Sequence, residues 1–332
     1  MTASAKGSSS RRAPVPERGS AQATREAFGE ALLELAPEHP EIVVLDADLS
    51  KSTMTQGFAK KYPSRHFEMG IAEQNMIGVG SGLALCGKIP FVTSFACFLA
   101  GRLETIRVCA AYNRTNLKMV GTHAGVGIGE DGASQMGLED IGAMRCLPHV
   151  AVLQPCDGEE TRQAVKWMVR HIGPVYLRLT RQKMPSFHGP DYRFEFGKCD
   201  VLWEPQRQPK HYQATIFASG GAVPNAVAAA RDLLPRGFSV RVVNACTLKP
   251  FDDEAVARAA SNSERIVTVE DHNIVGGLGS AVCEAAAQKG LAVPIVRIGV
   301  REFGESATPE QLYARHGLAS PNIEEACLRN LS

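Results

Sequence analysis

Three separate stretches of the sequence carry side chains that could do chemistry. Glu73 stands in "IAEQNMIGVG", where a carboxylate heads a run that otherwise looks buried. Phe95 and Phe98 lie close together in "PFVTSFACF". The third stretch, "GTHAGVGIGEDGASQ" (121–135), mixes polar side chains with glycines, and such flexibility is costly unless the backbone must approach a ligand closely. Its polar residues include His123, Glu130, Asp131 and Gln135.

Each of these features also has a purely structural interpretation. A glutamate such as Glu73 in the first turn of a helix complements the positive end of the helix dipole. Phe95 and Phe98 could simply belong to a core. The glycine-rich stretch could be a turn, although its spacing does not fit the calcium loop of an EF-hand. The rest of the sequence shows no cluster of metal ligands, so no metal site is predicted on this chain.

The elements that must position these residues alternate between short apolar runs and helical patterns. Strands are predicted at 41–50, 90–96, 117–123, 150–157 and 174–182, and helices at 23–35, from about 71, at 103–113 and at 158–171. This alternation is typical of an α/β fold in which helices cover both faces of a parallel sheet. Open sheets of this kind bind ligands at the carboxyl ends of their strands, and Asp48 lies at such an end.

A second α/β series follows a polar segment over about 185–209, within which 192–203 could pair as a hairpin. Strands are predicted at 214–220, 239–245, 265–271 and 293–299, and helices at 222–234 and 277–290. We therefore expect two domains, 21–195 and 196–332. Residues 1–20 lack the apolar core of a signal peptide and are rich in Ser, Gly, Pro and Arg, which predicts a disordered tail.

The composition is that of an ordinary soluble globular protein, with 332 residues, 44% hydrophobic residues and a net charge of +1. No long basic run argues for nucleic acid or for an anionic membrane. The apolar segment 77–101 is broken at Gly87 and Pro90 into pieces too short to cross a bilayer. Nine cysteines without a C-x-x-C pair favour reduced thiols and a cytoplasmic location.

The three chemical stretches, taken in this order, resemble the pyrimidine-binding region of transketolases, the thiamine-diphosphate enzymes that move two-carbon ketol units. The segments "LDADLSKST", "LTRQ", "LKPFD" and "TVEDHNIVGGLGSAV" fit the same family, so the resemblance covers about residues 20 to 332. It implies a pyrimidine-binding domain followed by a transketolase C-terminal domain.

The resemblance also implies a role for each matching residue. Glu73 matches the glutamate that hydrogen-bonds N1′ of the coenzyme's aminopyrimidine and so controls the proton on which catalysis depends. Phe98 matches the aromatic residue that stacks on the pyrimidine, and Phe95 lines the same pocket. Gln135 matches a pyrimidine-contacting position that is His in many transketolases. The remaining matches are Asp48 at the coenzyme, Arg25, Ser52, His123 and Arg181 at the substrate's phosphate, and Asp131 at a sugar hydroxyl.

One half of a transketolase active site has no match in this sequence. The family binds the coenzyme's diphosphate through a divalent cation held by a Gly-Asp-Gly segment and an Asn, and the few residues before Thr24 cannot hold that domain. We therefore expect a separate N-terminal subunit that carries the Mg²⁺ ligands. By analogy with the family, whose coenzyme lies at a subunit interface, the assembly would be a heterotetramer with two copies of each subunit.

Two other functions remain open at this stage. The β subunit of a 2-oxo acid dehydrogenase has a similar length and a comparable glutamate, but Arg25 and Arg181 argue against it. A non-catalytic binding subunit of the same fold is the other alternative, and the joint presence of the site residues argues against it. The sequence does not name the ketose and aldose phosphates, for which pentose phosphates are the default.

Overall fold

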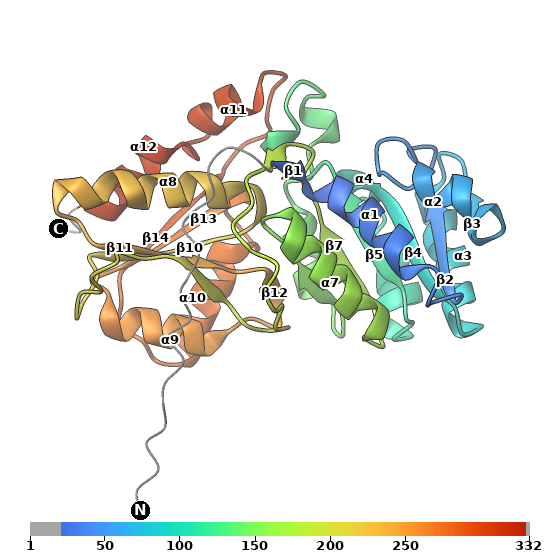
Figure 1. The fold of residues 1–332 in the computed structure, drawn as a ribbon, viewed down its shortest axis with the longest axis horizontal. Helices are drawn as coiled ribbons and strands as arrows, with labels where there is room; N and C mark the ends of the chain where they lie inside the picture. The colour runs from blue at the N-terminus through green and yellow to red at the C-terminus, as the bar shows by residue number, and fades with distance from the viewer. Residues whose placement is uncertain (1–20, 330–332) are drawn as a thin grey trace, which may run out of the picture.

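The two predicted α/β units are present in the computed structural model, which describes residues 21–329 (Figure 1). The tail predicted over 1–20 lies outside the described residues. Within the described part of the chain, no helix is long and apolar enough to cross a membrane. The predicted α/β fold class is confirmed, with sheets that are mostly but not wholly parallel.

The first sheet has seven strands in the order β12-β6-β7-β5-β4-β2-β3. They are β2 (Ile42–Asp46), β3 (His66–Glu68), β4 (Ile89–Phe95), β5 (Lys118–Thr122), β6 (Ala151–Leu153), β7 (Val175–Arg178) and β12 (Thr247–Lys249). All neighbours pair in parallel except β12 and β6, which are antiparallel. The accompanying helices are α1 (Thr24–Leu35), α2 (Gln56–Lys61), α3 (Glu73–Leu85), α4 (Ala96–Ala100), α5 (Leu103–Thr105), α6 (Asp140–Cys146) and α7 (Gly158–Arg170).

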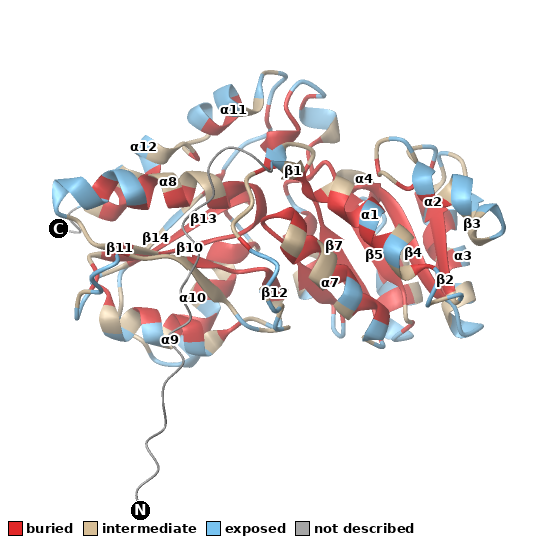
Figure 2. Cartoon of the chain, viewed as in Figure 1, coloured by how far each residue is buried: buried red, intermediate tan, exposed pale blue. Residues whose placement is uncertain are grey.

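Alternate residues of the inner strands of this sheet belong to two different cores. Ile42 and Val44 pack in a cluster with the apolar residues of α1 and α7, whereas Val43 and Leu45 join a cluster with α3 and α6. This follows from the two-residue period of a strand, which sends successive side chains to opposite faces. Because both faces are covered by helices, the inner strands are buried almost throughout, whereas the edge strand β3 is mostly exposed (Figure 2).

The second sheet has five strands in the order β14-β13-β10-β11-β9. They are β9 (Asp200–Trp203), β10 (Ala214–Ala218), β11 (Val240–Asn244), β13 (Ile266–Asn273) and β14 (Ile295–Val300), and only β9 is antiparallel. Its helices are α8 (Val223–Leu233), α9 (Asp253–Asn262), α10 (Leu278–Gln288), α11 (Pro309–Arg315) and α12 (Ser320–Leu328). The cores of the two units merge, because Phe217 and Val243 pack in the same cluster as Val152 and Tyr176.

Short elements complete the described chain. A two-stranded antiparallel pair joins β1 (Gln22–Ala23) to β8 (Lys183–Met184). Single turns of 3₁₀-helix occur at Pro63–Arg65, Val126–Ile128, Ala133–Gln135, Gly220–Ala222 and Leu234–Arg236, and a π-helix spans Ile106–Tyr112. The structure thus divides the helix predicted at 103–113 into α5 and this π-helix.

The hairpin considered for 192–203 does not form. Only β9 lies in that stretch, and it pairs with β11 instead. Phe194 and Phe196 lie against the Trp167 ring of α7, with ring centroids 6.1 Å and 4.1 Å away, so this segment packs on a helix rather than on itself. The prediction also missed β12, which follows the expected boundary near residue 195 yet extends the first sheet. The boundary itself stays a prediction.

Candidate active site

Glu73 is a buried carboxylate at the first position of α3, with 4% of its surface exposed. Its Oε1 accepts a hydrogen bond from the Ser94 hydroxyl near the end of β4, at 3.3 Å. No other donor among the described residues reaches the Glu73 carboxylate. The residue lines an open hollow of about 830 Å³ beside α3, together with Asn75, Val79 and Arg102 among others. One oxygen of this carboxylate is therefore left free for a ligand that enters this hollow.

One glycine of α3, Gly80, explains how that carboxylate comes so near the sheet. A Cβ atom on Gly80 would lie 2.6 Å from Val92 Cγ1 in β4 and 2.9 Å from Leu117 Cδ1. Only glycine therefore allows α3 to pack this closely over β4 without a shift of its neighbours. The close approach brings the start of the helix to the carboxyl end of the strand, where Ser94 and Glu73 meet.

The aromatic residues follow directly on this strand. Phe95 is the last residue of β4, and Phe98 lies on α4, with ring centroids 5.5 Å apart and planes inclined by 8°. The other neighbour of Phe95 is the ring of His123, at 3.9 Å and 24°. Phe98 is only half-buried, so part of its ring is available to stack on a flat ligand.

His123 is a neutral imidazole held between two partners. Its Nε2 lies 3.1 Å from Arg25 Nη1, which can only donate, so Nε2 accepts and the ring proton is on Nδ1. The Nδ1–H group then donates to Thr122 Oγ1 at 2.9 Å. Burial, together with the charges of Arg25 and Arg181, lowers the pKa of His123 to about 3. At neutral pH His123 therefore contributes hydrogen bonding but no charge.

Arg25 and Arg181 form a cationic site next to this histidine. Arg25 Nη1 also donates to the Ser52 carbonyl at 2.7 Å, while its buried Nε has no hydrogen-bond partner in the described chain. Burial and the nearby charge of Arg181 lower the pKa of Arg25. Arg181 Nη1 donates to the Ile128 carbonyl at 2.5 Å. Arg181 Nη1 also lies 3.3 Å from Glu130 Oε2, so part of its charge is already balanced. The unpaired N–H group of Arg25 and the half-exposed guanidinium of Arg181 are features that a site for an anion needs.

The structure joins most of the predicted residues by contacts. Glu73 contacts Ser94, which precedes Phe95 in β4. Phe95 stacks on His123, and His123 contacts Arg25. Asp131 Oδ1 lies 3.9 Å from Arg181 Nη1. Gln135 lies beside this group, because its carbonyl accepts from Cys97 Sγ at 3.2 Å.

Two predicted residues differ from the expected picture. Ser52 meets Arg25 through its backbone carbonyl rather than its hydroxyl. Asp48 is exposed, and its N–H group donates to Glu68 Oε1 at 2.7 Å; within residues 21–329 no hydrogen bond or ion pair joins it to another predicted site residue. Asp46, a buried residue that supports this site, was missed by the sequence analysis. Its Oδ2 accepts hydrogen bonds from the hydroxyls of Thr53, Thr55 and Thr93 at 2.6–2.9 Å. Asp46 thereby fixes the loop that carries Ser52. Its place as the last residue of a buried strand was the available signal.

The comparison with known proteins decides the family. A family model described as the pyrimidine binding domain of transketolase matches residues 20–186, and one described as the transketolase C-terminal domain matches residues 204–323. The chain belongs to the transketolase family. The predicted resemblance is thus confirmed.

Individual transketolase relatives match along nearly the whole chain. A protein of Methanocaldococcus jannaschii described as a transketolase C-terminal section is 40% identical over 311 residues, which cover 92% of this chain and 96% of that protein. The 6-deoxy-6-sulfo-D-fructose transketolase subunit SqwH of Clostridium sp. (strain MSTE9) is 38% identical over 304 residues, covering 91% and 92%. A solved structure described as "Split gene transketolase, inactive beta4 tetramer" superposes with a TM-score of 0.84 at 44% identity, covering 92% and 97%.

The site residues of this transketolase chain fit the aminopyrimidine half of thiamine diphosphate, the coenzyme that the family implies. The unpaired oxygen of Glu73 can accept a hydrogen bond from a protonated ring nitrogen. The exposed part of Phe98 can stack on an aromatic ring. Both side chains are also held by protein contacts, Glu73 by the Ser94 hydroxyl and Phe98 by the ring of Phe95.

A buried cluster of ionisable groups lies elsewhere, between α7 and β9 of this transketolase chain. His188 Nδ1 lies 3.0 Å from Asp157 Oδ2 and its Nε2 lies 3.2 Å from Asp200 Oδ2. With Cys156 and Glu160 these residues form two sets of three that could each hold a metal ion, Cys156, Asp157 and His188 in one and Glu160, His188 and Asp200 in the other. However, Asp157 Oδ2 already accepts three hydrogen bonds and Glu160 Oε1 accepts two, so protein donors saturate the oxygens. We interpret the cluster as a structural network.

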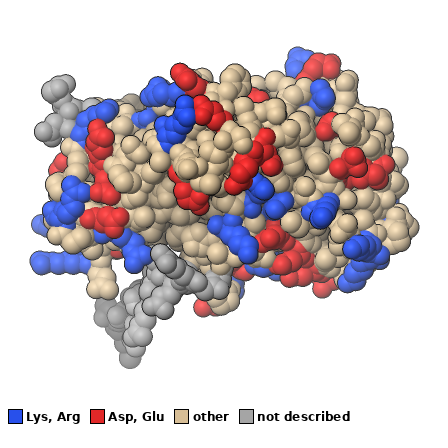
Figure 3. All heavy atoms as spheres, turned by 90° about the horizontal axis from the view of Figure 1, so that it is seen from above, with Lys and Arg blue, Asp and Glu red and all other residues tan. Residues whose placement is uncertain are grey.

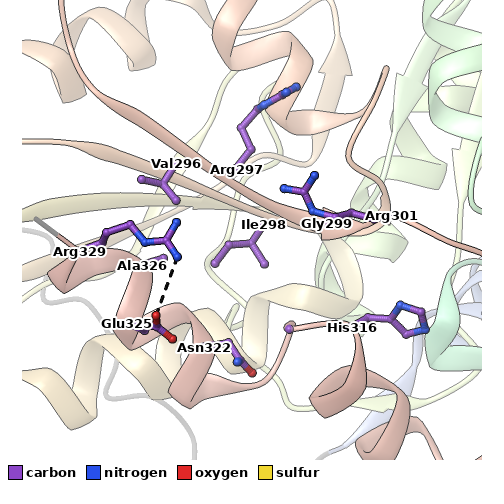
Figure 4. Close-up of a pocket in the computed structure, with 11 residues that line it drawn as sticks. Val296, Arg297, Ile298, Gly299, Arg301, His316, Asn322, Glu325, Ala326 and Arg329 are labelled. Carbon is purple, nitrogen blue, oxygen red and sulfur yellow. Dashed lines mark ion pairs between the residues drawn. The ribbon is translucent and has the colours of Figure 1, made fainter. Parts of the chain in front are cut away.

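A second cavity, of about 240 Å³, lies on the C-terminal unit between β14 and α12 (Figure 4). Its lining includes Arg297, Arg301 and Arg329, but none of the predicted site residues. Arg329 pairs with Glu325 at 3.9 Å and Arg297 donates to the Ile274 carbonyl at 3.3 Å. On the face of the molecule seen from above, acidic and basic side chains are interspersed and no single-sign patch dominates (Figure 3).

Proposed function

We propose that this chain is the C-terminal subunit of a split transketolase, which transfers a two-carbon ketol unit from a ketose phosphate to an aldose phosphate. The observation that carries the proposal is the chain of contacts from Glu73 through Phe95 and His123 to Arg25. It sets a free carboxylate oxygen, an aromatic face and a cationic site side by side. A coenzyme that carries the ketol unit would meet the first two, and a phosphorylated sugar would meet the third.

Glu73 is the proposed catalytic residue. Thiamine diphosphate, when bound, supplies the nucleophilic carbon that takes up and passes on the two-carbon unit. The free oxygen of Glu73 holds a proton at N1′ of the aminopyrimidine, and the Ser94 hydroxyl keeps the carboxylate turned toward that position. Acid–base help from a positioned group of this kind is worth roughly 10²–10⁴-fold in rate.

Three further residues would hold the aminopyrimidine. Phe98 stacks on it, and Phe95 supports Phe98 from behind, as their nearly parallel rings permit. Gln135, whose backbone carbonyl accepts from Cys97 Sγ beside Phe98, would contribute a further hydrogen bond. For Asp48 we keep a role at the coenzyme as a proposal, since its carboxylate is exposed on the loop after β2.

The cationic site would bind the substrate's phosphate. Arg25 would contribute its buried, unpaired Nε–H group, and Arg181 its half-exposed guanidinium, which the phosphate would share with Glu130 and Asp131. His123 and Ser52 complete this site, and Asp131 lies where it could accept a hydrogen bond from a sugar hydroxyl. Hydrogen bonds to charged groups contribute about 1.5–3 kcal/mol each, enough to select phosphorylated sugars.

The proposal includes a partner subunit. Mg²⁺ and its ligands for the coenzyme's diphosphate would belong to a separate N-terminal subunit, in a heterotetramer with two copies of each chain. Two relatives support this view, because one is described as a transketolase subunit and another as an inactive tetramer of a split-gene transketolase. All nine cysteines are free thiols, which agrees with the proposal that the protein functions in the reducing cytoplasm.

The identity of the sugar substrate is a separate part of the proposal. Pentose phosphates are the default for the family, and the cationic site accommodates any tetrahedral oxyanion at the end of a sugar. The relative named for 6-deoxy-6-sulfo-D-fructose shows that a sulfonate must be tested beside phosphates. A sulfonate has the same arrangement of oxygens but a single negative charge, so it would gain less from two arginines.

The test is to co-purify the chain with a candidate diphosphate-binding subunit and to assay ketol transfer with thiamine diphosphate and Mg²⁺. We expect no turnover from this chain by itself and ketol transfer by the pair. Turnover of ketose phosphates by the isolated chain would contradict the half-site proposal. Activity of the pair on 2-oxo acids, without any on ketoses, would establish the dehydrogenase alternative instead.

A further inference from the structure

The C-terminal unit reaches directly into the glycine-rich stretch of the first unit. Asp271, a fully buried residue near the end of β13, accepts hydrogen bonds from Val126 N at 2.7 Å and from Gly127 N at 3.0 Å. Gly125 has a φ of +80°, and a Cβ atom there would lie 2.2 Å from the Asp271 carboxylate. The carboxylate thus sits against bare backbone, at a point where no side chain would fit.

A single hydroxyl group extends this contact to a second part of the site. The Tyr313 hydroxyl, from α11, donates to Asp271 Oδ2 at 2.9 Å and accepts from Gln182 Nε2 at 2.8 Å. Gln182 directly follows Arg181 in the sequence. One oxygen atom of the C-terminal unit therefore bridges the carboxylate under the glycine-rich stretch and the segment that carries Arg181.

Two more contacts close the arrangement. Arg181 Nη1 donates to the Ile128 carbonyl at 2.5 Å, which links the two segments directly. From the C-terminal unit, Ser306 Oγ donates to the Glu130 carbonyl at 2.6 Å. The backbone between His123 and Asp131 is thereby held from the side of the C-terminal unit at three places, Val126, Gly127 and Glu130.

The Asp271 carboxylate is buried, so its charge must be stabilised by hydrogen bonds from the protein. Burial raises the pKa of Asp271, because a charge in this position has lost its water. Three donors compensate the loss: the two backbone N–H groups and the Tyr313 hydroxyl. Removing one of them leaves the carboxylate short of a partner, so the geometry of the loop depends on all three.

We infer that Asp271 and Tyr313 form a positioning clamp by which the C-terminal unit sets the distance between His123 and Arg181, and hence the affinity for the substrate's phosphate. The inference rests on the proposed function, since it assigns the clamp's effect to the phosphate site. Neither residue touches the coenzyme position at Glu73. The clamp should therefore govern KM for phosphorylated sugars and leave kcat and coenzyme binding almost unchanged.

The test is Tyr313→Phe in the complex with the N-terminal subunit, because this change deletes one oxygen and keeps the buried ring. We expect KM for a pentose phosphate to rise about 5- to 30-fold, the effect of one or two kcal/mol. KM for an unphosphorylated ketol donor and kcat should stay within about twofold of wild type. Hydrogen exchange at the Val126 and Gly127 amides should become faster in the full chain.

A control is Tyr192→Phe, which removes a partly buried hydroxyl that likewise donates to a carboxylate, Glu160, at 2.9 Å. It should leave KM unchanged. Asp271→Asn serves as the second variant, since it keeps the shape but turns one acceptor into a donor that faces the loop's N–H groups. It should raise KM for the pentose phosphate in the same selective way.

The outcomes separate the clamp from the proposed function. A wild-type pair that transfers no ketol unit from any sugar phosphate would refute the proposed function and the clamp with it. A wild-type pair that is active while Tyr313→Phe loses thermal stability at unchanged KM would refute the clamp alone. The hydrogen bonds would then serve only to hold the two units together.

Discussion

Replacement of Arg25 by methionine should weaken the binding of phosphorylated sugars specifically. The side chain offers a buried, unpaired Nε–H group, and its Nη1 already serves Ser52 and His123. Loss of one hydrogen bond to a charged group is worth about 1.5–3 kcal/mol, which corresponds to a rise in KM of about 10- to 150-fold. Arg25→Lys, which keeps the charge but not the fork of donors, should fall between wild type and Arg25→Met.

The assay is steady-state ketol transfer by the pair of subunits, with a pentose phosphate and with an unphosphorylated ketol donor. The phosphorylated substrate should lose affinity, while KM for the unphosphorylated donor should change less than about threefold. Arg231→Met, at an exposed arginine of α8, is the control for loss of an arginine as such. Equal losses with both donors would refute the reasoning, because Arg25 would then act through the fold rather than through the phosphate.

Two further predictions test other parts of the molecule. Phe98→Ala should weaken the binding of thiamine diphosphate by the pair about 2- to 12-fold in calorimetry, beyond any loss of buried area, since stacking contributes about 0.5–1.5 kcal/mol; an unchanged Kd would remove Phe98 from the coenzyme site. Burial alone would lower the pKa of His188, but hydrogen bonds to Asp157 and Asp200 raise it to about 11. Because the folded pKa lies above the unfolded value of about 6.5, this stabilisation is complete below pH ~6.5 and is lost as the pH rises toward 11. Wild type should therefore exceed His188→Gln by about 3–5 kcal/mol in free energy of unfolding at pH 6, and the gap should narrow with rising pH in chemical denaturation; a constant gap would contradict it.

The sequence could predict the repeating part of the fold because strand and helix periods are local. Ile42 to Leu45 alternate between two cores, as a buried parallel strand requires. The strand β12 could not be predicted, since three residues become a strand only by pairing with β6 nearly a hundred residues earlier. The hairpin at 192–203 was wrong for a similar reason, because Phe194 and Phe196 find Trp167 on a distant helix.

In the candidate site, too, the features set by local sequence could be predicted and those set by distant contacts could not. Glu73, Phe95, His123 and Arg25 were found through motifs, and the structure joins them by contacts. The neutral state of His123 depends on its burial and on two arginines from distant segments, which no local pattern reveals. Asp271 escaped notice because its partners, Val126 and Gly127, lie about 145 residues away and use only their backbone.

Glu73 is the residue on which the proposed function depends most, because it controls the proton at N1′ of the coenzyme. The rate of ketol transfer by the pair should be compared between wild type and Glu73→Gln, at saturating thiamine diphosphate and Mg²⁺. Glutamine keeps the size and the hydrogen bond with Ser94, but its amide is neutral and cannot exchange a proton with N1′. We therefore expect kcat to fall by roughly 10²–10⁴-fold with the coenzyme still bound. A Glu73→Gln enzyme with a rate within about threefold of the wild-type rate would show that Glu73 does not control this proton.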